Sequence, residues 1–163
     1  KYLPDIACRL DDPRVNVRIG DGVGYIAELE KSADVIIIDS TDPIGPGEGL
    51  FSGAFYQSVA NALKPGGIMV AQSESPWHSQ KSLMRIQSNI SKGFAHRRPY
   101  VGSVPTYPRG LWSWTMASGD PIDPNQLDIA RLKTLGPLKY LNPELAKAAF
   151  ALPEFLKVKL GIE

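Results

Sequence analysis

The chain has 163 residues, enough for one domain with a hydrophobic core of its own. Hydrophobic residues make up 43% of it, charged residues 21%, and the net charge is +1 at neutral pH. This balance indicates neither a nucleic-acid partner nor a membrane surface, and no apolar run approaches the ~20 residues of a membrane span. The single cysteine, Cys8, excludes an internal disulfide and favours a reducing, cytoplasmic location.

The predicted elements begin with the end of a helix at residues 3–10, which Asp12 and Pro13 terminate. Residues 15–19 alternate as a strand, and Gly20-Asp21-Gly22 then turns the chain into a short helix over residues 23–30. Because the first residues look like the interior of a helix and the chain begins with Lys1, we expect a truncated or processed product.

Residues 34–51 are the most informative segment. The β-branched run from Val35 to Ile38 predicts a strand buried on both faces, and it ends in Asp39. Asp42 follows within a segment rich in Pro and Gly, which predicts a loop without helix or sheet. In open α/β sheets, ligands bind beyond the carboxyl ends of the strands. Two acids there, with no Lys or Arg nearby in sequence, suit a ligand that brings its own positive charge, such as an amine.

The remaining elements continue the alternation. We expect a helix at residues 54–63 that residues 64–67 terminate, a strand at 68–72 with Gln72 and Glu74 at its carboxyl end, and a helix at 80–92. Strands at 98–104 and 111–117 follow without an intervening helix and should pair antiparallel, and the tail from residue 127 is helical in pieces. Trp112 and Trp114 share one face of their strand, where core or interface is the default interpretation. The pattern predicts a Rossmann-like α/β sheet.

Five motifs occur in one order along the chain: GDG (20–22), DSTDPIGP (39–46), QSESPW (72–77), PTYP (105–108) and AFALPEF (149–155). In this order they resemble the spermidine synthase (polyamine aminopropyltransferase) family of bacterial type. The resemblance covers nearly the whole chain and implies that residues 1–163 are the C-terminal portion of that family's catalytic domain.

For the fold, the resemblance implies the sheet of AdoMet-dependent methyltransferases, whose usual strand order is 3-2-1-4-5-7-6. Residues 15–19 would be its third strand and residues 34–39 its fourth. The first two strands, their Gly-rich loop and the N-terminal β-domain of the family are absent from this sequence. We therefore expect a companion N-terminal segment or chain, and a homo-oligomer when the protein is complete.

For the site, the resemblance makes Asp39 the catalytic acid-base group and places Asp42, Glu74 and Tyr107 at the diamine. A free amine has a pKa near ~10 and arrives as ammonium, so a carboxylate must hold it and take its proton before it can attack. The family also implies that Asp21 binds the adenine amino group. Gly20 and Gly22 would let the backbone approach the ring.

Pro46 would line the adenine pocket. The residues alone leave other interpretations open: a simple helix cap for Asp21, and a packed aromatic in a Pro-rich turn for Tyr107. His78 and His96 have no partners at metal-ligand spacing, so no metal site is expected.

The expected reaction is aminopropyl transfer from decarboxylated S-adenosylmethionine, as co-substrate and with no other cofactor, to putrescine. Its products are spermidine and methylthioadenosine. Two alternatives remain at this point. One is an AdoMet-dependent methyltransferase, against which the paired acids count. The other is a catalytically silent fragment or subunit that needs a partner chain.

Overall fold

In the computed structural model, which describes residues 7–107 and 109–162, four strands form one mixed sheet in the order β1-β2-β4-β3. The strands are β1 (Ala33–Ile38), β2 (Leu63–Gln72), β3 (His96–Ser103) and β4 (Leu111–Ser118). β1 and β2 are parallel, and β4 runs antiparallel to both of its neighbours. The predicted Rossmann-like α/β class is confirmed, and the observed order corresponds to the 4-5-7-6 end of the methyltransferase-type sheet.

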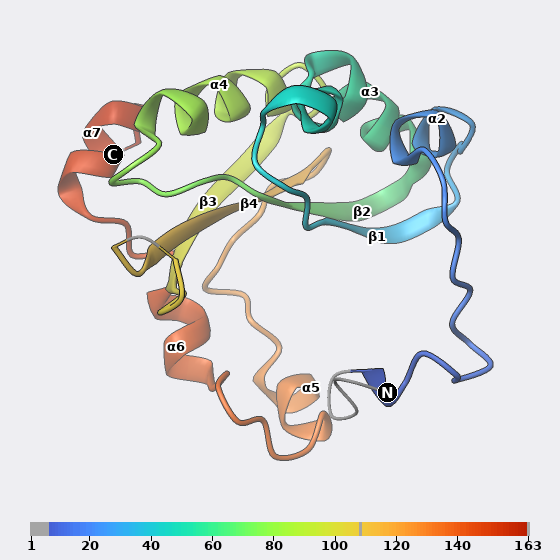
Figure 1. The fold of residues 1–163 in the computed structure, drawn as a ribbon. Helices are drawn as coiled ribbons and strands as arrows, with labels where there is room; N and C mark the ends of the chain where they lie inside the picture. Colours follow the sequence, from blue (N-terminus) through green and yellow to red (C-terminus); the bar gives the residue numbers. More distant parts are fainter. Residues whose placement is uncertain (1–6, 108, 163) are drawn as a thin grey trace.

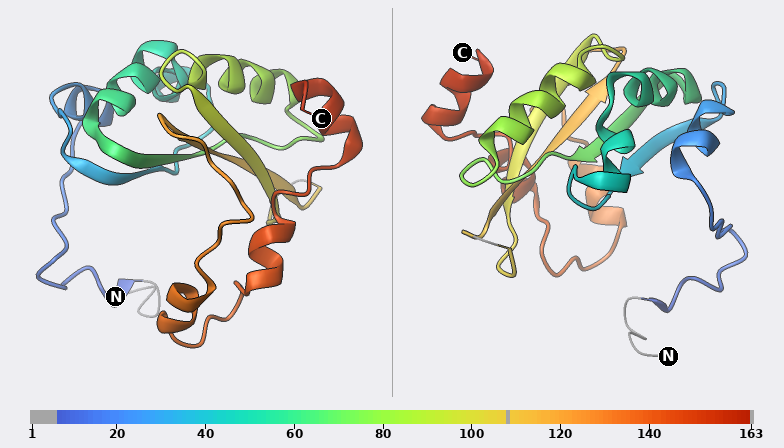
Figure 2. Two further views of the ribbon diagram at one scale, coloured as in Figure 1. Left: turned by 180° about the vertical axis from the view of Figure 1, so that it is seen from behind. Right: turned by 45° about the horizontal axis from the view of Figure 1, so that its top comes forward.

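The helices lie on both sides of this sheet but are unevenly distributed (Figure 1). One face carries α2 (Gly22–Ala27), α3 (Gly53–Ala62) and α4 (Gln80–Ile90). On the other side lie α5 (Ile129–Thr134) and α6 (Pro143–Ala148), while α7 (Glu154–Leu160) lies beyond the start of α4 (Figure 2). The end of α6 is tied to β3, because the Val101 N–H donates to the Ala149 carbonyl at 2.9 Å.

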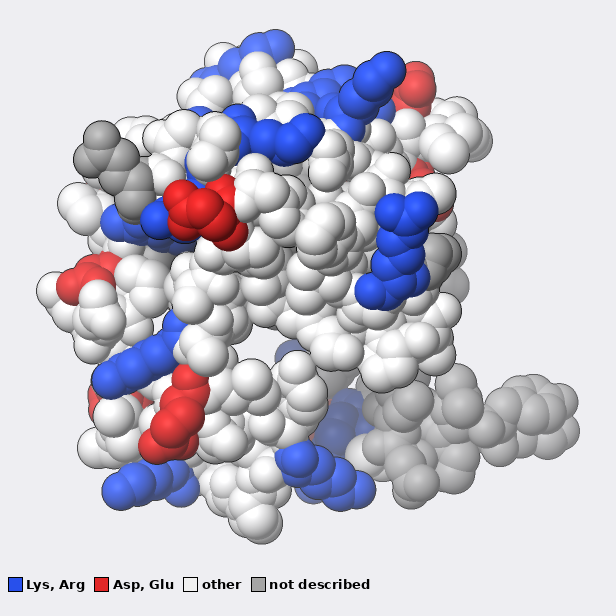
Figure 3. Space-filling view, turned by 90° about the vertical axis from the view of Figure 1, so that its left-hand side faces the viewer, with Lys and Arg blue, Asp and Glu red and all other residues white. Residues whose placement is uncertain are grey.

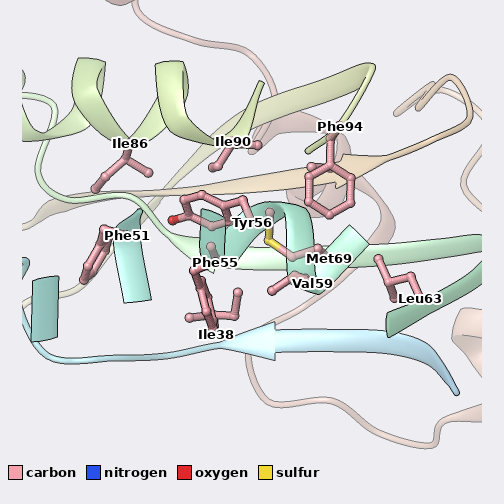
Figure 4. Close-up of a cluster of buried hydrophobic side chains, with 12 residues drawn as sticks. Ile38, Phe51, Phe55, Tyr56, Val59, Leu63, Met69, Ile86, Ile90 and Phe94 are labelled. Carbon is pink, nitrogen blue, oxygen red and sulfur yellow. The ribbon is translucent and has the colours of Figure 1, made fainter. Parts of the chain in front are cut away.

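The core lies between the sheet and α3 and α4 (Figure 4). Ser52 caps α3 by accepting a hydrogen bond from the Phe55 N–H, and α4 buries residues at helical spacing. Apolar side chains of both layers meet there: Ile38, Met69, Ala71 and Ala117 from the sheet, with Phe55, Tyr56, Val59, Ile86 and Ile90 from the helices. This packing fixes the positions of the strand ends that carry the candidate site.

The predicted strand at residues 15–19 is wrong, because this segment forms no regular structure. It is extended but pairs with no other strand, and the Ile19 side chain is fully exposed. An alternating apolar segment becomes a strand only where a neighbouring strand completes its hydrogen bonds. The prediction at residues 3–10 falls largely on residues outside those described.

The prediction that the run from Val35 to Ile38 is buried on both faces is also wrong. Ile36 and Ile38 face the core, whereas Val35 and Ile37 are 58% and 73% exposed. Side chains alternate between the faces of a strand, and within the described residues no helix covers the second face of β1. The apolar run therefore belongs to a sheet that is covered on one face only at this edge.

Three smaller differences concern element boundaries. The Pro/Gly segment was predicted as a loop throughout, but Gly45–Phe51 forms a 3-10 helix, which accommodates Pro46 in its first turn. The helix predicted for residues 23–30 ends earlier, at Ala27. β2 begins at Leu63, and its pairing with β1 shifts register between Ala33 and Val35, which places the Pro/Gly residues of β2 in an irregular part of the ladder.

Candidate active site

A pocket beyond the carboxyl ends of β1 and β2 contains the two acids of the Pro/Gly segment. We call it the acid pocket, and nine residues line it: Asp39, Ser40, Thr41, Asp42, Gln72, Val104, Tyr107, Trp112 and Trp114. Both carboxylates, the tyrosine and both tryptophans thus come together from segments far apart in the sequence. This is the edge at which parallel α/β sheets bind their ligands.

The loop after β1 holds the acids in a tight turn. The Ile44 N–H donates to the Asp42 carbonyl at 2.7 Å. A Cβ on Gly47 would lie 2.8 Å from that same carbonyl oxygen and 2.9 Å from Thr41 Oγ1, so only glycine allows this approach. Within the described residues neither Asp39 nor Asp42 forms an ion pair. Their charge is therefore available to a cation from outside.

Aromatic side chains from the β3–β4 hairpin provide the apolar part of the pocket. Tyr107 contacts Trp112 edge to face, with ring centroids 4.6 Å apart, and Trp114 stacks on Tyr100 at 5.6 Å. The hairpin loop is closed by a hydrogen bond from the Val104 N–H to the Gly110 carbonyl. Carboxylates beside aromatic rings suit a ligand with ammonium groups joined by methylenes.

Gln72 lines the acid pocket although the predicted set of site residues omits it. Its Oε1 accepts a hydrogen bond from the Glu74 N–H at 3.1 Å, which orients the amide. Its place at the end of β2 is the signal that would have identified it. For Trp112 and Trp114 that signal is their spacing of two on β4, and the prediction that they share a face is correct.

Glu74 lies behind the acid pocket and is not one of its lining residues. It is only 4% exposed, its φ is +73°, and its Oε1 has no hydrogen-bond partner. Ser113 holds the Glu74 carbonyl through both its N–H and its hydroxyl, the latter at 2.6 Å. Burial raises the pKa of the Glu74 carboxyl, and the charge of Asp42 raises it further. Two interactions thus link Glu74 to residues of the acid pocket: the electrostatic repulsion between its carboxyl and Asp42, and the hydrogen bond from its N–H to Gln72.

Asp21 forms the N-cap of α2. Its two carboxylate oxygens accept hydrogen bonds from the N–H groups of Val23, at 3.0 Å, and Gly24, at 3.1 Å. It does not line the acid pocket, and neither do Gly20, Gly22 or Pro46. α2 packs beside the 3-10 helix that Pro46 enters, since a Cβ on Gly49 would lie 3.5 Å from Val23. The four predicted nucleoside-binding residues thus lie on two neighbouring elements next to the acids.

The described residues provide neither a metal cluster nor a membrane-spanning helix. They contain no group of three or more His, Cys, Asp or Glu that could hold a metal ion. None of the helices described is long and apolar enough to cross a membrane. On the side of the molecule where α7 lies, Lys and Arg are scattered among uncharged residues and some Asp and Glu (Figure 3).

A mixed sheet in this order, with a pocket beyond the carboxyl ends of its parallel strands, defines the fold class as a methyltransferase-like α/β domain. Within that class the chain belongs to the spermine/spermidine synthase family, whose domain model matches residues 1–127.

Relatives and solved structures agree with this assignment. The chain is 48% identical over 157 residues to the polyamine aminopropyltransferase of Caldicellulosiruptor saccharolyticus, covering 96% of this chain and 56% of that protein. It resembles the crystal structure of a spermidine synthase in complex with the transition-state analogue AdoDATO, with 42% identity, a TM-score of 0.92 and coverage of 98% of this chain and 55% of the other.

The spermidine synthase of Thermotoga maritima is similar at 38% identity and a TM-score of 0.88, covering 99% of this chain and 54% of that one. The chain thus spans about half the length of the relatives it matches.

Proposed function

We propose that residues 1–163 form part of the catalytic domain of an aminopropyltransferase, which transfers an aminopropyl group from decarboxylated S-adenosylmethionine to putrescine. The observation that carries this proposal is the acid pocket, where Asp39 and Asp42 lie beside Trp112 and, among the described residues, neither acid forms an ion pair. Such a pocket suits a short diamine: the acids attract its ammonium groups, and the rings cover its methylenes.

In this reaction the amine nitrogen attacks the methylene carbon bonded to the sulfonium. The new C–N bond forms as the C–S bond breaks, and its electron pair returns to sulfur, giving neutral methylthioadenosine. Asp39 takes the proton that the ammonium must lose before its lone pair can attack. Asp42 anchors the diamine, and Tyr107 contributes its hydroxyl at the same pocket. Glu74 contributes to diamine binding indirectly, through its interactions with Asp42 and Gln72.

The nucleoside would lie beside this pocket, along α2 and the 3-10 helix. Asp21 caps α2 with both oxygens, yet each oxygen retains a lone pair for the adenine amino group. Gly20 has no atoms within 4 Å of the position of a Cβ, so the backbone is open there. Gly22 and Pro46 would form the adjoining walls of the adenine pocket.

A companion N-terminal segment is part of the proposal, because one face and one edge of β1 are left open. Val35 and Ile37 are exposed at the centre of this strand, beside the half-buried Ile68 and Val70 of β2. We call these four residues the open face. Exposed apolar side chains at an unpaired strand edge are typical of a surface that is covered in the complete protein.

The topology supports a position for such a segment beside β1. α2 and α3 are on the same face of the sheet, and connections between parallel strands are right-handed. The strand that precedes α2 must therefore lie on the side of β1 away from β2. Residues 15–19 do not pair with β1 on that side. The free edge of β1 therefore has room for further strands, and the open face has room for helices.

The experiment that tests this proposal supplies the part of a relative that this chain does not match. This chain is co-expressed with the N-terminal portion of the Caldicellulosiruptor saccharolyticus relative that it does not match. We expect a complex that makes spermidine from putrescine and decarboxylated S-adenosylmethionine, and no activity from the chain alone. Methylation of an amine with S-adenosylmethionine would favour the methyltransferase instead, and ordinary activity of the chain alone would disprove the need for a companion.

A matched pair of variants tests the docking surface separately from catalysis. Ile37 and Val158 are equally exposed, at 73% and 72%, but only Ile37 belongs to the open face. Ile37→Asp should abolish co-purification with the companion, whereas Val158→Asp on α7 should leave it intact. Equal binding by both variants would show that the open face is not the docking surface. The mass of the complex in solution tests whether several copies of it assemble, as the expected homo-oligomer requires. The cytoplasmic location remains a prediction.

A further inference from the structure

A second pocket adjoins the acid pocket and shares Trp114 with it. We call it the apolar pocket, and it is lined by Tyr100, Val101, Gly102, Ser103, Trp114, Tyr140, Leu141, Leu145, Ala148 and Ala149. No charged side chain is among them. Its far wall is α6, and its floor is β3. Its volume is about 420 Å³, larger than the roughly 260 Å³ of the acid pocket.

Among the residues that the structure describes, Trp114 is the one that lines both pockets. It pairs with Tyr100 across the β3–β4 ladder, and the two rings stack with centroids 5.6 Å apart and planes 19° from parallel. A Cβ on Gly102 would lie 3.1 Å from the indole, so the ring rests directly against the glycine backbone. The indole is therefore held in place as a partition between the acids and the apolar pocket.

We propose that Trp114 determines acceptor specificity by closing the acid pocket against diamines that carry an apolar substituent on the non-reacting nitrogen. This inference rests on the proposed function. With the diamine's ammonium at Asp42, such a substituent has to pass the position of the indole to reach the space beyond. Replacing the indole with a small side chain joins the two pockets, and the apolar pocket then receives the substituent.

The test uses the complete enzyme, which is the complex of this chain with its N-terminal companion. Putrescine and N-hexylputrescine are the acceptors. Trp114→Ala should raise the ratio of kcat/KM for N-hexylputrescine to kcat/KM for putrescine. The expected increase is about fourfold for each methylene that becomes buried, which corresponds to the free energy of removing one methylene from water. Trp114→Leu, a milder change, should raise the ratio less. Circular dichroism and Tm verify that both variants fold.

Two further variants distinguish the joining of the two pockets from general damage to the acid pocket. Trp112 lines only the acid pocket, so Trp112→Ala should lower kcat/KM for both acceptors and leave the ratio unchanged. Leu145→Trp in the Trp114→Ala background refills the apolar pocket and should bring the ratio back toward that of the parent.

The outcomes are distinguishable. An unmodified complete enzyme that transfers nothing to putrescine would disprove the proposed function and this inference with it. Normal transfer to putrescine with an unchanged ratio in folded Trp114→Ala and Trp114→Leu would overturn the inference alone. A raised ratio that Leu145→Trp does not reverse would also overturn it, because the substituent would then be bound outside the apolar pocket.

Discussion

Asp39 and Asp42 line the same pocket, one at the residue directly after β1 and the other within the turn that Gly47 closes. Neither carboxylate is paired with a cation in the part of the chain described. Two unpaired carboxylates in one pocket repel each other, and a bound ammonium relieves that repulsion. The first two predictions follow from this arrangement.

Asp39→Asn in the complete enzyme should lower kcat by ~10²–10⁴, the usual effect of losing a general base, while nucleoside affinity stays nearly unchanged. Asn preserves the shape of the side chain but accepts no proton at neutral pH. Steady-state kinetics with putrescine measure kcat, and calorimetry measures nucleoside binding. Asp34→Asn is the control, because Asp34 is exposed and bound to Lys64 at 2.8 Å, at the opposite end of β1. Near-parental kcat for Asp39→Asn would remove Asp39 from the catalytic role.

Asp42→Asn should mainly raise the KM for putrescine, by about tenfold or more, because it removes one charge-assisted hydrogen bond to the ammonium. The effect should shrink in high salt, where the remaining electrostatic attraction is screened. Measuring KM at two ionic strengths checks both statements. A loss confined to kcat would contradict the anchoring role.

Glu74→Gln should stabilise the chain at neutral pH. Burial raises the pKa of this carboxyl above its unfolded value of 4.5, so ionised Glu74 lowers stability as pH rises through the folded pKa. Gln has no charge to bury, and its advantage should be present at about pH 7–8 and disappear below about pH 4. Thermal unfolding across this range measures it. A Tm difference that is independent of pH would show that the Glu74 charge is not the cause.

Tyr56→Phe should leave stability unchanged or raise it by about 1 kcal/mol, corresponding to a few degrees in Tm. The Tyr56 ring is fully buried, its hydroxyl has no hydrogen-bond partner among the described residues, and burial raises the pKa of the phenol. Removing that hydroxyl removes an unsatisfied polar atom from the core. The exposed Tyr140 provides the control, since Tyr140→Phe should change little. Clear destabilisation by Tyr56→Phe would reveal a hydrogen-bond partner for the hydroxyl.

Gly93→Ala should destabilise the chain by about 1–3 kcal/mol through overpacking. A Cβ on Gly93 would lie 2.4 Å from the Tyr56 carbonyl oxygen, so the turn after α4 rests directly on the backbone of α3. Gly119→Ala is the matched control, because nothing lies within 4 Å of the corresponding Cβ position. Urea unfolding of both variants gives the difference. Equal free energies of unfolding for the two variants would mean that the turn after α4 can move away from α3 without loss of stability.

The site could be predicted in part because strand ends are visible in the sequence. Asp39, Asp42 and Tyr107 were expected at the carboxyl edge, and the structure brings these three together. Glu74 was expected in the same set but lies behind it, because its left-handed backbone turns the residue inward, where Ser113 holds its carbonyl. Whether a residue after a strand faces the pocket or the core depends on such local turns, which sequence spacing does not reveal.

The sequence by itself determined the elements whose signals are local: the helices after β1 and β2, the strand that ends just before Asp39, and the hairpin of β3 and β4. Periodicity, capping residues and Pro/Gly positions act over a few residues and can be read without a fold. Only the tertiary structure decided which apolar residues are buried. Ile37 and Ile38 are adjacent and chemically identical, yet one is 73% and the other 9% exposed. Burial depends on what packs against each face of a strand, and that packing comes from residues distant in the chain.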